Sequence, residues 1–199
     1  MIAVAIIGVL ASVAVPAFNG YVMASRGAEG IQDVRQMFLG SVSYWEKGSA
    51  GQGLAAAGGG TGEHCLITEL AGGMVPTAPA FPPTPERRTY DFAGDERFQA
   101  LSFTKDEPSH FALTWMTRGL TLTDPDGFYA VTACSGADGL AYIFYSMCDI
   151  DGDGQIGGYS QSVMAEGGVL RRLGGITSIQ SGLSRSTWGA CPFCAEGPD

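Results

Sequence analysis

The first 25 residues of the chain form one uncharged, mostly apolar segment. No Asp, Glu, Lys or Arg occurs from Met1 to Ser25. About 17 to 25 apolar residues span the hydrocarbon core of a bilayer, and a helix that is hydrophobic on all sides is buried in lipid or in protein. The residues expected to form this helix are Ile2, Val4, Ile6, Ile7, Gly8, Val9, Leu10, Val13, Val15, Pro16 and Phe18.

Three interpretations of this segment compete. A secretory signal peptide should start with a positive region, whereas Met1 is followed directly by apolar residues. A plain membrane anchor is the second interpretation. The third is an assembly helix, which is buried first in lipid and later in protein. The third is favoured because the helical pattern continues beyond Pro16.

From residue 26 onward the apolar positions take the spacing of an amphipathic helix. They recur at steps of three and four residues, in Ile31, Val34, Phe38, Val42 and Trp45. Glycines that begin at Gly48 end the pattern. The sequence therefore predicts one helix that is uncharged over residues 1–25 and amphipathic over residues 26–47.

Such a helix would be roughly 70 Å long at 1.5 Å per residue. That is too long for a compact domain, so we expect its first half to project. Pro16 should kink the helix, because proline removes a backbone hydrogen bond and clashes with the preceding turn. Gly20, Gly27 and Gly30 should weaken its middle, because glycine is a poor helix former.

The rest of the chain has the pattern of a loop followed by a sheet. Residues 48–89 are rich in Gly and Pro and are expected to form an irregular surface loop. Residues 90–199 should form an antiparallel β-sheet head with a Cys-containing tail at its C-terminus. Strand-like runs occupy residues 110–116, 128–134, 140–148 and 156–164, and a turn at 136–139 would join the second and third of them as a hairpin. The predicted fold class is α+β, with the long N-terminal helix packed on a small antiparallel sheet.

An aspartate-rich segment lies between the last two predicted strands. Asp149, Asp151 and Asp153 alternate, and Gly154 follows at the sixth position, as in the front half of an EF-hand calcium loop. Position 12 is Ser160 instead of the usual bidentate Glu, so calcium should bind weakly. The alternative is an acidic turn whose carboxylates bond to their own backbone. Both interpretations place the segment on a surface loop between strands.

Five cysteines are the disulfide candidates: Cys65, Cys134, Cys148, Cys191 and Cys194. Dispersed cysteines in an acidic, glycine-rich chain suit an oxidising compartment. The expected hairpin argues against a bond between Cys134 and Cys148, because it places them far apart along the strand. Cys191 and Cys194 are separated by two residues, as in a redox dithiol, but they lack its strand-to-helix setting. We therefore expect them to be structural. The pairing itself stays open.

Composition argues against several classes of function. The 199 residues carry a net charge of −9 and no dense Lys and Arg cluster, so no direct nucleic-acid site is expected. The histidines are His64 and His110, and His110 is expected at the surface or at a sheet edge. No nucleotide-binding or nucleophile motif stands in a strand-to-helix context. We expect a protein without enzymatic activity.

The segment from Met1 to Phe18 resembles the N-terminal helix of type IV pilins and of type II secretion pseudopilins. Gly8 corresponds to the helix glycine of that signature and Pro16 to its kink proline. Before the position of Met1, family members carry a short basic leader ending in Gly and a Phe-Thr-Leu-Ile-Glu-Leu type segment. No residue here corresponds to the leader-cleavage site or the assembly glutamate, so either the start codon lies further upstream or the chain was trimmed. Residues 86–90 and 98–103, with the aspartate segment, resemble more loosely the head of myxobacterial major pilins.

The resemblance implies a structural subunit of a type IV pilus, with roles in surface adhesion, twitching motility or DNA uptake. The subunit would lie in the inner membrane before assembly and then in an extracellular filament, on the surface of a Gram-negative bacterium. Its partners would be further copies of the chain, a prepilin peptidase and the pilus assembly machinery. A type II secretion pseudopilin is the alternative within the same architecture. A monomeric, membrane-anchored, extracytoplasmic calcium-binding module is the alternative of another class. Calcium is the one cofactor considered.

Overall fold

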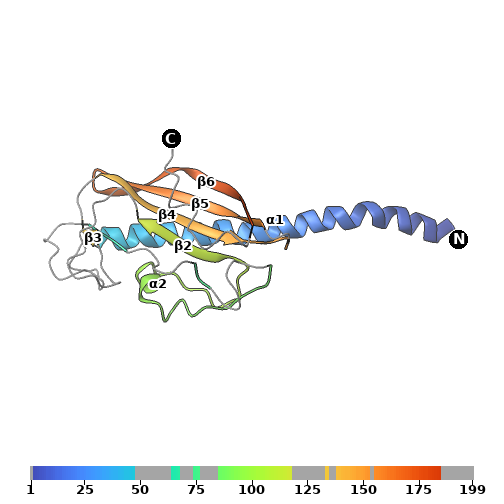
Figure 1. The fold of residues 1–199 in the computed structure, drawn as a ribbon, viewed down its shortest axis with the longest axis horizontal. Coiled ribbons are helices and arrows are strands. Elements are labelled where there is room, and N and C mark those ends of the chain that lie inside the picture. The colour runs from blue at the N-terminus through green and yellow to red at the C-terminus, as the bar shows by residue number, and fades with distance from the viewer. Residues whose placement is uncertain are drawn as a thin grey trace.

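The computed structural model describes residues 2–47, 64–67, 74–76, 85–117, 133–134, 138–152 and 155–184. Figure 1 shows a long helix whose first half stands free of the head, while a sheet lies along its second half. The predicted α+β class, with a long helix packed on a small antiparallel sheet, is confirmed.

Helix α1 (Ile2–Glu46) is continuous over 45 residues. It stays helical through Pro16, and Figure 1 shows its projecting half as gently curved. The expected amphipathic face packs on the head: Val34, Phe38 and Trp45 are buried, and Ile31 and Val42 are half-buried. The periodicity therefore predicted the docked face of α1 correctly.

The main sheet has four antiparallel strands in the order β2-β4-β5-β6 within the described part of the chain. They are β2 (Ala112–Thr117), β4 (Gly139–Cys148), β5 (Gln155–Glu166) and β6 (Val169–Ser184). The first three correspond to predicted strands. β6 was not predicted, because its sequence contains paired arginines and glycines instead of a clear apolar alternation. A two-residue turn at Gly167 and Gly168, both with positive φ, joins it to β5 and has the glycines that such hairpin turns require.

The expected hairpin between residues 128–134 and 140–148 is wrong. The described part of the first run is β3 (Ala133–Cys134), which pairs with β1 (Cys65–Leu66) in a separate antiparallel pair. Over residues 142–147 of β4 both edges are taken by β2 and β5, so β3 cannot pair along that stretch. Residues 128–132 lie outside the described part.

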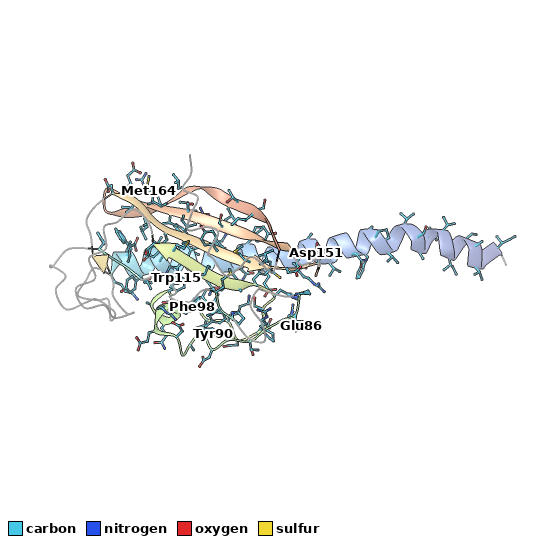
Figure 2. The ribbon with its side chains drawn as sticks, viewed as in Figure 1. Glu86, Tyr90, Phe98, Trp115, Asp151 and Met164 are labelled. Atoms are coloured by element: carbon cyan, nitrogen blue, oxygen red, sulfur yellow. The ribbon has the colours of Figure 1, made fainter. Side chains whose placement is uncertain are left out.

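The core lies between α1 and one face of the sheet. Trp45 and Met37 of α1 belong to the same buried cluster as Tyr142, Phe144 and Trp115 of the sheet. The short helix α2 (Glu96–Ala100) adds Phe98, which contacts Trp115 edge to face at 5.2 Å between ring centroids. Figure 2 shows Phe98 and Trp115 among the side chains that fill this side of the head.

Three glycines let α1 approach the head closely. A Cβ atom at Gly30 would lie 2.7 Å from the Phe111 ring, one at Gly27 would lie 2.6 Å from the Tyr159 hydroxyl oxygen, and one at Gly40 would overlap the carbonyl oxygen of Leu101. The sequence suggested that Gly27 and Gly30 weaken the helix. The structure shows that the missing side chains make room for packing, which offsets their poor intrinsic helix propensity.

Candidate functional site

The projecting half of α1 is the largest apolar surface among the described residues. Ten of its large apolar side chains are each 55–80% exposed. They belong to Ile2, Val4, Ile6, Ile7, Val9, Leu10, Val13, Val15, Phe18 and Tyr21. In Figure 2 these side chains point outward all round the free helix. Monomeric soluble proteins rarely leave such an extended apolar surface in water, and surfaces of this kind mark sites of contact with lipid or protein.

The dimensions of this surface match a bilayer. Residues 2–25 extend about 36 Å at 1.5 Å per residue, and a bilayer core is about 30 Å thick. Among the described helices, α1 is long and apolar enough to cross a membrane. The first charged residue is Arg26, and the first buried residue of α1 is Gly27. The free apolar half therefore ends where the head begins.

A partly buried charge cluster fastens α1 to the loop that precedes β2. The Lys105 ammonium group donates to Glu29 Oε1 at 2.8 Å and to Asp33 Oδ2 at 2.8 Å, and it donates to Ser109 Oγ at 3.0 Å. The side chain of Asp33 is only 5% exposed. Because a buried carboxylate needs a counterion and hydrogen bonds, this cluster fixes the helix against the head.

The two carboxyl groups of the cluster differ in their environment. Burial raises the pKa of Asp33, and the hydrogen bond and charge of Lys105 only partly oppose this. Burial also acts on Glu29, but the same lysine outweighs it and holds the pKa of Glu29 below its ordinary value. Sequence reasoning missed this cluster. Its signal was a charged residue, Asp33, at a position that shares the buried face of α1 with Gly30 and Met37.

The aspartate segment forms the connection between β4 and β5, as expected. Asp149 is fully buried, and its Oδ1 accepts a hydrogen bond from the Gly152 backbone N–H at 2.9 Å. Gly152 has a φ of 76°, a conformation that favours glycine. Asp151 is exposed, and Figure 2 places it at the end of the head from which α1 projects. Asp153 lies outside the described residues.

The aspartate segment departs from an EF-hand loop at its twelfth position. Ser160, the twelfth position, lies within β5 and its hydroxyl bonds to the Thr177 hydroxyl at 2.8 Å. A cation here would therefore be held by the aspartate segment without that position. Among the described residues, no group of three or more His, Cys, Asp or Glu side chains is arranged to hold a metal. The calcium hypothesis stays a prediction.

Both histidines have structural contacts. His64 stacks on Trp45 with 4.7 Å between ring centroids, and its Nδ1 lies 2.8 Å from the Trp45 carbonyl oxygen. His110 is buried, so the expected surface position is wrong. Its place just before β2, an edge strand of the main sheet, agrees with the expected sheet edge. Its Nε2 accepts from Arg87 at 3.1 Å and its Nδ1 lies 3.0 Å from the Pro85 carbonyl oxygen. Burial lowers the pKa of His110, which fits a neutral ring that donates from Nδ1.

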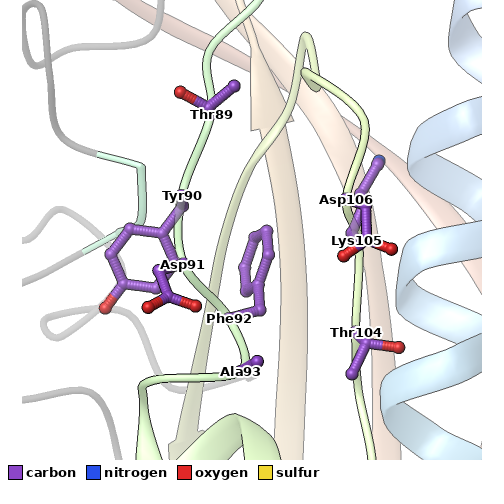
Figure 3. Close-up of a pocket in the computed structure, with 8 residues that line it drawn as sticks. All are labelled: Thr89, Tyr90, Asp91, Phe92, Ala93, Thr104, Lys105 and Asp106. Atoms are coloured by element: carbon purple, nitrogen blue, oxygen red, sulfur yellow. The ribbon is translucent and has the colours of Figure 1, made fainter.

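A surface hollow of about 390 Å³ lies between two segments of the head. Figure 3 shows Tyr90 and Phe92 on one segment and Thr104, Lys105 and Asp106 on the other. The Tyr90 hydroxyl donates to Asp95 at 2.9 Å. Burial and this hydrogen bond raise the pKa of Tyr90. The phenol therefore stays protonated and is a poor proton donor, and the Lys105 ammonium group is already engaged with α1.

The cysteines fall into separate regions. Cys148 ends β4 and its side chain is buried. Cys65 and Cys134 are opposite each other in the β1–β3 pair. Cys191 and Cys194 lie outside the described residues. Strand β4 begins at Gly139, shortly after Cys134 in the chain, and ends at Cys148. At the usual rise per residue its two ends are about 30 Å apart, so Cys148 lies far from the end nearest in sequence to Cys134.

The fold and its exposed helix define a class: an α+β head on a long N-terminal helix that is able to anchor in a membrane. Comparison of the chain with protein-family models, with curated proteins and with solved structures finds no match.

Proposed function

We propose that this chain is the structural subunit of a type IV pilus filament. The projecting half of α1 holds the subunit in the inner membrane before assembly and packs against the same helix of neighbouring subunits afterwards. The filament lies outside the cell and serves surface adhesion, twitching motility or DNA uptake. The head has no enzymatic role in this proposal.

The observation that carries the proposal is the exposure of the apolar, uncharged half of α1 beside a head with its own buried core. Burial of one Val, Leu, Ile or Phe side chain contributes roughly 1.5–3 kcal/mol. Nine such side chains per subunit supply enough driving force to hold a polymer together without covalent links. Contacts of this kind between identical subunits build open helical arrays when the rotation does not close.

The resemblance of Met1 to Phe18 to the pilin helix supports the same function. It also implies a prepilin peptidase and a pilus assembly machinery as partners. A type II secretion pseudopilin shares the architecture and differs in where the polymer accumulates. A monomeric calcium-binding module on a membrane anchor shares the helix but forms no polymer.

Val9→Lys tests the proposal, with Leu173→Lys as its control. Both residues are exposed apolar side chains, at 67% and 53%, and both variants add one positive charge. A single Lys near the centre of a membrane helix costs about 2.5–3.5 kcal/mol, which the surrounding apolar residues offset. In a filament core the same ammonium group would be buried against apolar neighbours without a counterion.

We therefore expect Val9→Lys to fractionate with membranes but to form no filaments, and Leu173→Lys to form them. The measurements are electron microscopy of material sheared from cells and immunoblots of the sheared and membrane fractions. Normal filaments from Val9→Lys would contradict the assembly role of α1. A wild-type chain that stays monomeric in membranes would favour the anchored module, and a polymer confined to the periplasm would favour the pseudopilin.

A further inference from the structure

We propose that Cys65 and Cys134 form a disulfide bond that closes the end of the head opposite the projecting helix. The two residues face each other in the antiparallel pair of β1 and β3, in which Leu66 also faces Ala133. Figure 1 shows β3 at that end of the head, near the end of α1. The bond would join two segments that are 69 positions apart in the sequence.

Backbone geometry permits this bond. Directly opposite residues of an antiparallel pair have Cα atoms about 4.5 or 5.5 Å apart, depending on the hydrogen-bonding position. Disulfides form at Cα separations of about 4.4–6.8 Å. Opposite residues also lie on the same face of the ribbon. Both kinds of antiparallel position therefore meet the distance requirement without a movement of the backbone.

Contacts next to Cys65 hold β1 in this register. The backbone N–H of Ile67 donates to the Tyr142 hydroxyl at 2.7 Å, and the Trp115 indole donates to the Ile67 carbonyl oxygen at 3.3 Å. On the other side, His64 stacks on Trp45. Leu66 is buried in the main core cluster. Strand β1 is thus fixed to the core on both sides of the cysteine.

Asp138, four positions after Cys134, is fixed as well. The carboxylate of Asp138 accepts a hydrogen bond from the Gly167 backbone N–H at 2.8 Å, which ties the start of β4 to the turn between β5 and β6. Gly168 of the same turn accepts a hydrogen bond from the Trp45 indole at 2.9 Å. Both cysteines therefore sit close to anchored residues, which raises the effective concentration of one thiol near the other.

Cys148 is a poor competitor for either cysteine. It lies at the far end of β4, and burial raises the pKa of its thiol to about 12. Only the thiolate reacts in disulfide exchange. Cys148 therefore serves as an internal control for a thiol that stays reduced.

The bond forms by exchange with a disulfide donor, such as oxidised glutathione or a dithiol–disulfide oxidoreductase of the extracytoplasmic compartment. One cysteine thiolate attacks the donor disulfide, forms a mixed disulfide and releases one donor thiolate. The second cysteine thiolate then attacks the sulfur of the first and releases the other donor thiolate. The two cysteines lose two protons and two electrons, and the donor is reduced to two thiols. In cells the reaction requires a head outside the cytoplasm, as in the proposed function.

Peptide mapping of the full-length chain in detergent tests the assignment. The protein is equilibrated in a buffer of reduced and oxidised glutathione, alkylated at its remaining thiols and digested without reduction. Trypsin alone leaves Cys134 and Cys148 on one peptide, because no Lys or Arg occurs between Arg118 and Arg171. Chymotrypsin is therefore added, since Tyr142, Phe144 and Tyr145 lie between the two cysteines.

We expect mass spectrometry to find one linked peptide pair that contains Cys65 and Cys134, and to find Cys148 alkylated after unfolding. The pair should disappear in Cys65→Ser and in Cys134→Ser and persist in Cys148→Ser. Alkylation of both cysteines in the wild-type chain, or a link from either of them to Cys191 or Cys194, would overturn the assignment. The assay needs no filament, so failure of the proposed function and failure of this bond are observed separately.

Discussion

The ammonium group of Lys105 bridges the loop before β2 to two carboxylates of helix α1, and replacing it with methionine tests how the helix is held. Lys105→Met keeps most of the length and volume of the side chain but removes the charge. Glu29 and Asp33 then lose their shared counterion. The consequence is greatest for Asp33, whose side chain is 5% exposed.

The expected magnitude follows from this burial. Removal of one partner of a buried ion pair costs about 3–5 kcal/mol, because the remaining charge stays buried without compensation. Asp33→Asn combined with Lys105→Met removes that uncompensated charge and should recover most of the loss. The comparison isolates the charge from the loss of packing, since both variants lack the lysine.

The loss should depend on pH in a defined direction. Burial raises the pKa of Asp33 above its value in the unfolded chain, and removal of the Lys105 charge raises it further. The folded state then binds a proton more readily than the unfolded state, so the neutral carboxyl is tolerated in acid. We expect the deficit of Lys105→Met to be largest near pH 7 and to shrink as the pH falls through the raised pKa of Asp33.

Urea unfolding of the full-length chain in detergent measures these differences. Trp45 and Trp115 are both buried in the core, so their fluorescence reports the unfolding of the head. A Lys105→Met variant within about 0.5 kcal/mol of wild type, the range of ordinary surface substitutions, would refute the reasoning. A double variant no more stable than Lys105→Met at pH 7 would refute the electrostatic explanation.

Three further predictions concern α1, His110 and the aspartate segment. Gly40→Ala should lower stability by about 1–3 kcal/mol, because its Cβ would overlap the Leu101 carbonyl oxygen. Gly20→Ala is the control, since nothing lies within 4 Å of its Cβ. Thermal unfolding compares the stabilities of the two variants. Burial lowers the pKa of His110, so the unfolded chain binds more protons in acid than the folded chain. The unfolding free energy should therefore fall as the pH drops below about 6.5. His110→Gln should make the unfolding free energy from urea unfolding depend less on pH between pH 7 and 5. Calcium at ten times its dissociation constant should raise the unfolding free energy by about 1.4 kcal/mol. Asp151→Asn should remove that increase when urea unfolding is compared with and without calcium.

Each of these predictions has an outcome that would count against it. Equal melting temperatures for Gly40→Ala and Gly20→Ala would show that α1 shifts freely against the head. An unchanged pH slope in His110→Gln would mean that another group causes the acid sensitivity. Absence of a calcium effect at 10 mM would favour the alternative of an acidic turn that bonds to its own backbone.

Several features of this protein were predictable from local pattern alone. The length of α1, its division into an uncharged and an amphipathic half, and its docked face follow from the spacing of apolar residues. Strands β2, β4 and β5 follow from their β-favouring residues, and the break between β4 and β5 follows from the aspartate segment. These properties are local, because a repeat of 3.6 or 2 residues is visible within a short window.

The candidate site was predictable only in part. The apolar surface of α1 was expected from the absence of charge between Met1 and Ser25, and the aspartate segment was expected on a loop between strands. The burial of Asp149 was not predictable, since an aspartate in an acidic loop has the composition of an exposed turn. The burial of His110 depends in the same way on residues 85 and 87, which approach it from another segment.

The sequence by itself determined the long helix, its free apolar half and the α+β class. Tertiary structure decided which distant segments meet: Lys105 with Asp33, Gly40 with Leu101, and Cys65 with Cys134. It also decided that β6 is a strand, because the edge of β5 and a two-glycine turn compensate for its weak pattern. The physical reason is that periodicity records which face of an element is apolar, whereas the partner on that face depends on the packing of the whole chain.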